Sequence, residues 1–285
     1  MKKVLSSVIS VLLVVGILVG ALTCFAGCKK KDDSKLYVGM ECGYQPFNFT
    51  QIDDSNGAVK ISNAQGYANG YDVMIAKKIA EELGKELVIV KYEFNSLING
   101  VNSGTLDLII AGMSPTAERK EAIDFSDAYY ESQLVIVVRK DGAFASATSL
   151  EDFKGAEIVA QNGTFHDRAL QEQGPAHGIV RQTPKDTFPD MIVALNAGTI
   201  DGYVAEEPGA IADCYANPNL TYIRLVNNST GFTASAEDVQ IAVGMKKGSA
   251  NLAAVNSALQ KLSAETRNQL MNDAIFFATG KNVVD

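Results

Sequence analysis

The sequence has little of the chemistry that metal and redox sites require. Its 285 residues include four cysteines and two histidines. No CxxC pair or cysteine–histidine cluster is present, and His166 and His177 lack the spacing of metal ligands. The sequence therefore predicts neither a metal ion nor a cofactor.

Basic residues are also in the minority. Lysine and arginine number 25 against 33 acidic residues, which gives a formal net charge of −8. An acidic surface repels phosphate backbones, so nucleic acid is not expected as a partner. The length is sufficient for two lobes, each with its own hydrophobic core.

The N-terminus has the pattern of a secretory signal, because Met1-Lys2-Lys3 precedes an apolar run over residues 4–26. The run ends in Phe-Ala-Gly-Cys, which resembles a bacterial lipobox. Cys28 is then the lipidated first residue after removal of residues 1–27, and residues 28–34 form a tether. The alternative is an uncleaved membrane helix, since the run is long enough to span a bilayer. The small residues before the cysteine favour cleavage.

Strands and helices are predicted to alternate along the rest of the chain. We expect strands at 35–40, 87–90 and 106–110, with helices at 71–83 and 95–102 between them. A second series follows from 133 to 225. The chain then ends with a strand at 240–245 and helices at 251–262 and 264–277. Such alternation is typical of a parallel sheet flanked by helices. Residues 50–69 are polar and are expected to form an extended hairpin or loop.

The most informative stretch is DLIIAGMSPTAERKEAIDFSDAYY, residues 107–130. A buried strand leads into residues 111–114, and Pro115-Thr116 opens a helical turn that carries Arg119. Free N–H groups at a helix start and an arginine together can bind a carboxylate. A strand-to-helix connection with a solvated arginine is the plainer alternative for a single arginine.

Residues 111–130 of this stretch closely resemble the signature segment of the bacterial extracellular solute-binding proteins that serve polar amino acid importers. The resemblance extends over essentially the whole chain after the signal. It implies an α/β, two-lobed fold of the type II periplasmic binding proteins, each lobe a mainly parallel sheet flanked by helices. Lobe 1 would comprise 35–131 and 242–285, and lobe 2 would be an insertion over 132–241 with a two-crossing hinge. Cys42 and Cys214 would then lie on different lobes, so no disulfide is expected between them.

The resemblance also implies a role for each site residue. The ligand carboxylate would be bound from both lobes, and its ammonium group by an acid with two supporting oxygens. Two aromatic rings would contact the ligand side chain, and a further acid would bind the distal end of that side chain. A carboxylate at this position favours a basic amino acid. The residues are Arg119, Ser114 N–H and Phe165 N–H for the carboxylate, Glu206, the Gly112 carbonyl and the Ser114 hydroxyl for the ammonium group, Tyr44 and Phe94 for the side chain, and Glu41 for its end.

Three departures from the family pattern accompany this assignment. Relatives commonly have Asp where this chain has Glu206, and Thr where it has Phe165. The usual aromatic C-terminal ending with tryptophan is absent, as the chain contains no tryptophan.

The implied function is capture of a polar amino acid by lobe closure and delivery to the permease and ATPase of an ABC importer. The protein would be a monomer, not an enzyme, anchored by lipid to the outer face of the cytoplasmic membrane or to the periplasmic side in a Gram-negative cell. Two alternatives remain at this point: a dehydratase-type enzyme using His166 or Glu41 as general acid, and a sensor module. His166 itself is interpreted as a rim or helix-surface residue. The Glu206-Glu207 pair is interpreted as charge recognition plus a helix-start acid rather than a hydrolytic pair.

Overall fold

The computed structural model describes residues 31–281. The predicted signal and lipidation site, Cys28, lie outside these residues. Within the described range, residues 34–281 form one compact unit. Within 31–281, no helix combines the length and the apolar character needed to cross a membrane.

The first sheet has the strand order β6-β1-β7-β14-β8. Its strands are β1 (Lys35–Met40), β6 (Glu86–Lys91), β7 (Leu108–Ile109), β8 (Ile123–Glu131) and β14 (Gln240–Lys246). β1 pairs in parallel with β6 and β7, whereas β14 is antiparallel to both β7 and β8. Four strands therefore share one direction and β14 runs against them, so the sheet is mixed.

The second sheet has the order β11-β10-β12-β9-β13. Its strands are β9 (Leu134–Arg139), β10 (Glu157–Val159), β11 (Val180–Arg181), β12 (Gly202–Glu206) and β13 (Leu220–Arg224). β10 is parallel to β11 and β12, and β9 is antiparallel to β12 and β13. The same four-to-one arrangement thus recurs, with β9 as the reversed strand.

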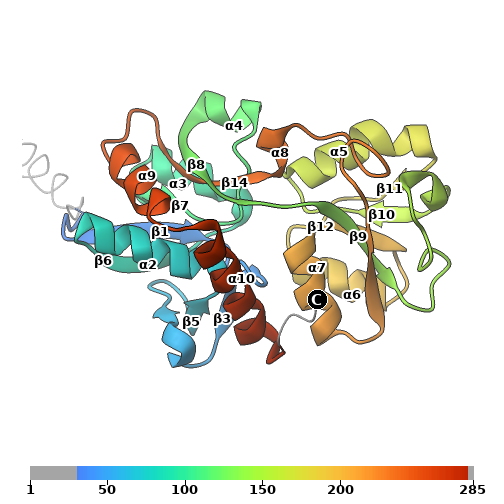
Figure 1. The fold of residues 1–285 in the computed structure, drawn as a ribbon, viewed down its shortest axis with the longest axis horizontal. Coiled ribbons are helices and arrows are strands. Elements are labelled where there is room, and N and C mark those ends of the chain that lie inside the picture. Colours follow the sequence, from blue (N-terminus) through green and yellow to red (C-terminus); the bar gives the residue numbers. More distant parts are fainter. Residues whose placement is uncertain (1–30, 282–285) are drawn as a thin grey trace, which may run out of the picture. The chain divides into compact units, whose positions relative to one another are not determined.

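Helices accompany both sheets, as the alternating pattern predicts (Figure 1). Those next to the first sheet are α2 (Tyr71–Leu83), α3 (Leu97–Asn102), α4 (Ala117–Ala122) and α9 (Leu252–Gln260); those next to the second are α5 (Phe165–Gln173), α6 (Phe188–Asn196) and α7 (Glu207–Ala216). Helix α2 has the predicted bounds, because Ile75 and Ile79 are fully buried and Gly84 ends it at a left-handed φ of 63°. The short helices are η1 (Ser55–Gly57), η2 (Phe94–Ser96), η3 (Leu150–Phe153), η4 (Gly174–His177) and α8 (Ala236–Val239).

The chain passes between the two sheets twice. The first passage leads from β8 to β9 and the second from β13 through α8 to β14. The two passages lie side by side, since Gln240 pairs with Glu131 and the Ser132 amide donates to the Val239 carbonyl at 3.1 Å. This arrangement is the two-crossing hinge expected from the sequence.

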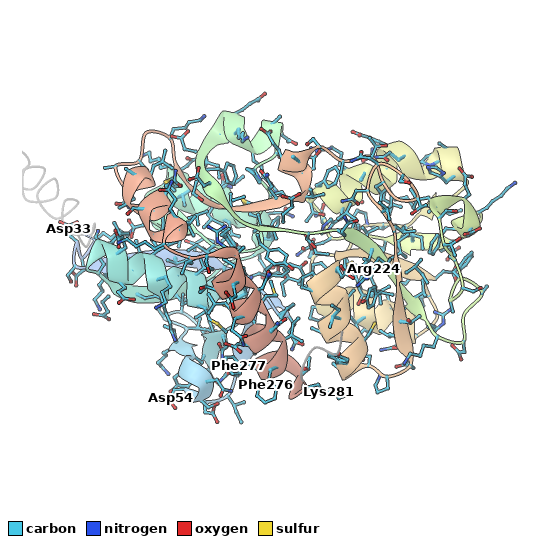
Figure 2. All side chains as sticks on the ribbon, viewed as in Figure 1. Asp33, Asp54, Arg224, Phe276, Phe277 and Lys281 are labelled. Carbon is cyan, nitrogen blue, oxygen red and sulfur yellow. The ribbon has the colours of Figure 1, made fainter. Side chains whose placement is uncertain are left out.

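Residues 43–69 build a small third sheet. Its order is β2-β3-β5-β4, with β2 (Gly43–Tyr44), β3 (Asn48–Gln51), β4 (Val59–Lys60) and β5 (Tyr67–Asn69), all antiparallel. Asp54, labelled in Figure 2, lies in the β3–β4 connection. The polar segment predicted as a hairpin or loop is therefore an antiparallel sheet with short strands.

The last helix, α10 (Ala264–Thr279), packs against α2 and also against α7. Figure 2 shows Phe276 and Phe277 on this helix, with ring centroids 6.1 Å apart. The largest buried apolar cluster includes residues from both sheets, such as Val38 and Val135. Cys42 is buried, Cys214 is half-buried, and both are free thiols.

Candidate functional site

A small cavity of about 20 Å³ lies where loops that follow strands of both sheets meet. It is lined by Tyr44, Phe94, Ala111, Gly112, Ser114, Arg119, Gln161, Thr164, Phe165, His166, Phe188 and Glu206. Seven of the eight predicted site residues are among them, and the eighth, Glu41, is hydrogen-bonded to the lining residue Gln161. The volume is that of about one water molecule. The sheets must therefore separate before a larger molecule can enter.

Arg119 connects the two sides of the cavity. The Thr116 hydroxyl caps α4 by accepting from the Arg119 amide, which fixes the start of the helix. The Arg119 guanidinium donates to the Ser114 carbonyl and, across the cavity, to the Gly163 carbonyl, each at 3.0 Å. Burial lowers the pKa of Arg119 to about 10, so the group stays charged at neutral pH.

The Gly112 turn beside Arg119 depends on glycine and on a buried acid. Gly112 has a φ of 61°, and a Cβ there would lie 3.1 Å from the Tyr44 ring. Its backbone also hydrogen-bonds Asp72, which accepts in addition from Tyr129 at 2.7 Å and Asn48 at 2.8 Å. Burial raises the pKa of Asp72 to about 6, and these bonds oppose the rise. Sequence reasoning missed Asp72, whose only visible signal was its place in the first turn of a helix.

On the other side, the turn before α5 presents its own N–H groups. The Thr164 hydroxyl donates to the Gln161 carbonyl at 2.7 Å and accepts from the Asp167 amide at 3.4 Å. Phe165, the first residue of the helix, is buried. The turn therefore places a helix N-terminus against the cavity, as predicted.

Glu206 is the acid of the cavity and is 5% exposed. Burial alone would raise the pKa of Glu206, but His166 and the Tyr44 hydroxyl, which donates to Oε2, hold it below its ordinary value. Tyr44 comes from the first side of the cavity and Glu206 from the second. Their hydrogen bond is therefore one of the contacts that join the two sides.

The interpretation of His166 as a rim or helix-surface residue was wrong. The side chain is 6% exposed, and its Nε2 lies 2.9 Å from Oε1 of Glu206. The second residue of α5 points inward because the helix begins directly at the cavity. Periodicity could not reveal this, since one residue at a helix start has no apolar stripe to place it.

Glu207, in contrast, faces away from Glu206. It opens α7 and pairs with Arg224 on β13, which Figure 2 labels, and it also contacts the Tyr222 hydroxyl at 3.5 Å. The two adjacent acids therefore have different surroundings, since Glu206 lines the cavity and Glu207 pairs with Arg224. The pair does not have the arrangement of two catalytic carboxylates facing one substrate.

Glu41 reaches across to the second side. Its Oε2 accepts from the Gln161 amide at 2.9 Å, whereas its buried Oε1 has no hydrogen-bond partner among the described residues. Burial raises the pKa of Glu41 to about 7, and the bond from Gln161 opposes that rise. A buried carboxylate oxygen without a donor is an unfavourable arrangement that a cation would relieve.

The two rings of the predicted pair, Tyr44 and Phe94, have different neighbours. Tyr44 stacks on Phe188 at 4.2 Å between centroids and on Phe47 at 4.9 Å. Phe94 lies against the Arg119 guanidinium, 5.2 Å from ring centroid to Cζ. Tyr44 and Phe94 both line the cavity, and Phe188 is a further aromatic ring of the lining that sequence reasoning missed. At the start of α6, Phe188 could not be distinguished from a core residue.

Known proteins share both this sequence pattern and this fold. A model of the bacterial extracellular solute-binding proteins, family 3, matches residues 36–275. The arginine-binding extracellular protein ArtP of Bacillus subtilis is 29% identical over 257 residues, which cover 88% of this chain and 91% of ArtP. The ABC transporter glutamine-binding protein GlnH of the same organism is 29% identical over 241 residues, covering 83% and 79%.

Solved structures agree with the sequence matches. An amino acid ABC transporter substrate-binding protein from Streptococcus pneumoniae bound to L-arginine has a TM-score of 0.72 and 30% identity, covering 85% of this chain and 94% of that one. An ancestral arginine-binding protein bound to arginine has a TM-score of 0.68 and 30% identity, covering 84% and 97%. With the family model spanning both sheets and the cavity between them, the chain belongs to the bacterial extracellular solute-binding proteins of family 3 and has the type II periplasmic binding-protein fold.

Proposed function

We propose that the protein captures a basic amino acid, arginine first among them, and delivers it to the permease and ATPase of an ABC importer. The observation that carries this proposal is that Arg119 and Glu206 line one cavity from opposite sides. A free amino acid presents a carboxylate and an ammonium group two bonds apart. A site for it must therefore offer a cation and an anion at short range.

The carboxylate would bind to Arg119 and to the N–H groups of Ser114 and Phe165. Arg119 suits this role because a guanidinium can form two parallel hydrogen bonds to a carboxylate. The ammonium group would bind to Glu206, with the Gly112 carbonyl and the Ser114 hydroxyl as further acceptors. Each charge of the ligand then has a partner, which burial requires.

The ligand side chain would extend between Tyr44 and Phe94 toward Glu41. Aromatic faces hold an aliphatic stem by contact area and attract a cationic tip. The unpartnered Oε1 of Glu41 supports a guanidinium or ammonium group at that end. Relatives named for arginine are consistent with this choice, whereas GlnH, named for glutamine, represents a neutral alternative.

Binding would drive closure of the two lobes, for which we retain the predicted boundaries of 35–131 with 242–285 and 132–241. Only the closed form can bind both ligand charges at once, so the ligand shifts the equilibrium toward it. Micromolar affinity corresponds to about −8 kcal/mol. A few charge-assisted hydrogen bonds, each about 1.5 to 3 kcal/mol, can supply this after the costs of binding.

The same proposal includes the location of the protein. Lipidation at Cys28 would hold it, as a monomer, at the outer face of the cytoplasmic membrane, or at the periplasmic side in a Gram-negative cell. Residues 28–34 would serve as the tether. The ligand would be released unchanged.

The test is calorimetric titration of the purified full-length protein with each of the twenty amino acids. We expect arginine or lysine to bind at micromolar affinity or tighter, and mass spectrometry to recover the ligand unaltered. Failure of all twenty to bind, or chemical conversion of the ligand, would overturn the proposal.

The specificity is tested with Glu41→Gln. This variant should weaken arginine binding at least tenfold and glutamine binding no more than twofold, because only the charge opposite the side chain is removed. The matched control is Glu93→Gln, which removes an exposed carboxylate that acts on Glu41 through space. If Glu41→Gln lost equal affinity for arginine and for glutamine, Glu41 would have no role in distinguishing basic from neutral ligands.

A further inference from the structure

The turn that carries Glu41 has an unusual backbone. β1 ends at Met40, so Glu41 and Cys42 lie beyond the strand pairing of the first sheet. Cys42 has a φ of 56°, in the left-handed region that residues with a side chain seldom adopt. Such a conformation persists only where the surrounding contacts fix it.

Asn48 supplies a contact that fixes this turn. Its side chain is fully buried, and Oδ1 accepts from the Cys42 amide at 2.7 Å. A backbone N–H can only donate, so the atom that faces it must be the side-chain oxygen. The Asn48 Nδ2 then points the other way and donates to Oδ2 of Asp72 at 2.8 Å. Asp72 therefore holds the Asn48 amide in the one orientation that supports the turn.

Asp72 is itself fixed by other elements of the first lobe. It is fully buried in the first turn of α2, where its amide donates to the Phe47 carbonyl at 2.8 Å. Its Oδ1 accepts from the hydroxyl of Tyr129, on β8, at 2.7 Å. A continuous chain of hydrogen bonds thus links α2 and β8 to the backbone beside Glu41.

The position of the Glu41 carboxyl depends on the same turn. The carboxyl rests against Gly43, since a Cβ there would lie 3.6 Å from Oε1. The side chain is buried, and Oε1 is the oxygen without a hydrogen-bond partner among the described residues. A rotation at Cys42 would displace Gly43 and so release the carboxyl from its position.

We propose that Asn48 is a positioning residue for ligand discrimination, because its bond to the Cys42 amide keeps the Glu41 carboxyl directed at the distal end of the ligand side chain. This inference rests on the proposed function and adds to it a residue outside the cavity lining. Loss of the bond relaxes the turn and weakens the contact between Glu41 and a basic side chain. The groups assigned to the ligand's carboxylate and ammonium lie on other segments and remain in place.

The experiment measures arginine and glutamine affinities by calorimetry on the full-length protein. Asn48→Leu removes both polar atoms at similar volume. Combining Asn48→Asp with Asp72→Asn exchanges the two side chains and restores the bonds. The new carboxyl at position 48 still accepts from the Cys42 amide, and the new amide at position 72 donates to it while accepting from the Tyr129 hydroxyl.

Asn69→Leu is the matched control. Asn69 is a buried asparagine of the same small sheet, and its Oδ1 accepts from the Gly70 amide at 2.8 Å rather than from the turn beside Glu41. Melting curves of each variant verify that it is folded.

We expect Asn48→Leu to lose arginine affinity at least fivefold and glutamine affinity less than twofold. The exchange variant should bind arginine within threefold of wild type. Added to Glu41→Gln, Asn48→Leu should change arginine affinity by less than twofold, because the carboxylate that it positions is already absent. A residue that only stabilised the fold would weaken both ligands alike, with or without Glu41.

Equal losses for the two ligands, no loss, or an undiminished loss in the Glu41→Gln background would overturn the role of Asn48. So would the same split between ligands in Asn69→Leu, or a folded exchange variant that binds arginine as weakly as Asn48→Leu. If Asn48→Leu does not fold, Asn48→Ser, whose side chain is too short to join Cys42 to Asp72, decides by the same criteria. Wild type that does not bind arginine refutes the proposed function instead, which is a distinguishable result.

Discussion

At the scale of single residues, the cavity consists of charged groups whose neighbours hold them in defined protonation states. Arg119 remains a cation despite burial, Glu206 is kept ionised by His166 and Tyr44, and Glu41 is shifted toward neutrality. The sequence pattern predicted the identities of these groups because they lie at strand ends in a familiar motif. It could not predict the pairing of His166 or Gln161, since those contacts join positions far apart in the chain.

Arg119→Ala should abolish measurable amino acid binding, a loss of at least a hundredfold. The variant removes the only lysine or arginine among the residues that line the cavity. The fold should persist, as α4 keeps its Thr116 cap. Calorimetry measures the affinity, with Lys78→Ala, at an exposed position of α2, as the charge-matched control. Unchanged affinity in Arg119→Ala would contradict the proposed carboxylate site.

Glu41 should also make the stability of the protein depend on pH. Burial raises its pKa from 4.5 to about 7, so the folded state favours the protonated form. The resulting stabilisation is complete below pH 4.5 and is lost as the pH rises through 7. By linkage, a shift of this size corresponds to about 3 kcal/mol.

Urea unfolding without ligand at pH 5 and pH 8 measures this effect. Between pH 5 and pH 8, the free energy of unfolding of wild type should fall by about 2 to 3 kcal/mol more than that of Glu41→Gln. Asp72 and Asp213 have pKa values raised to about 6 and about 7, chiefly by burial, and they contribute equally in both proteins. Parallel losses in the two proteins would show that Glu41 ionises freely in the folded state.

At the scale of elements, the site depends on where helices begin. Helices α4 and α5 are short, and each has a threonine as its N-cap residue. Their first turns carry Arg119 and Phe165. The pattern predicted most of the helices and the strands of the two large sheets other than β8, because apolar spacing and glycine stops are local signals. It missed β8 as a strand, since the half-buried sequence IDFSDAYYE has a weak alternation. The small sheet of residues 43–69 was also uncertain from sequence because its strands are only two to four residues long.

Thr164→Ala tests the contribution of a helix start to binding. Loss of the cap should destabilise the protein by about 1 kcal/mol. Arginine affinity should fall severalfold, because the N–H of Phe165 is no longer held toward the cavity. Ser263→Ala removes the equivalent cap from α10, away from the cavity, and should cost similar stability without affecting affinity. Chemical denaturation measures the stability of both variants, and calorimetry measures their arginine affinity. Equal arginine affinities of Thr164→Ala and Ser263→Ala would refute the link between the α5 helix start and binding.

At the scale of the whole molecule, the sequence motif was sufficient to predict two lobes, while the contacts that join them required coordinates. The Tyr44–Glu206, Glu41–Gln161 and Arg119–Gly163 contacts each bridge the cavity. Helix α10 was expected to return to the first lobe, and its packing on both α2 and α7 shows that it also touches the second sheet's helices.

Cys28→Ser tests the anchor. If Cys28 carries lipid, the substitution should move the protein from the membrane fraction to the soluble fraction of cells expressing it. Fractionation followed by immunoblotting measures this shift, with Cys42→Ser as the control because Cys42 is a buried thiol of the folded unit. Continued membrane association of the Cys28→Ser protein would indicate an uncleaved helix instead.

The paired passages at Glu131 and Gln240 have a mechanical consequence. Two strands joined by hydrogen bonds resist twisting about their length, because rotation would stretch the bonds between them, whereas both can bend together. For the proposed closure of the two lobes, the paired passages favour bending along one angular coordinate over independent rotations. In that proposed closure, a ligand bound to one lobe would meet the other lobe already in the correct orientation, so little rotational entropy would be lost when the lobes come together.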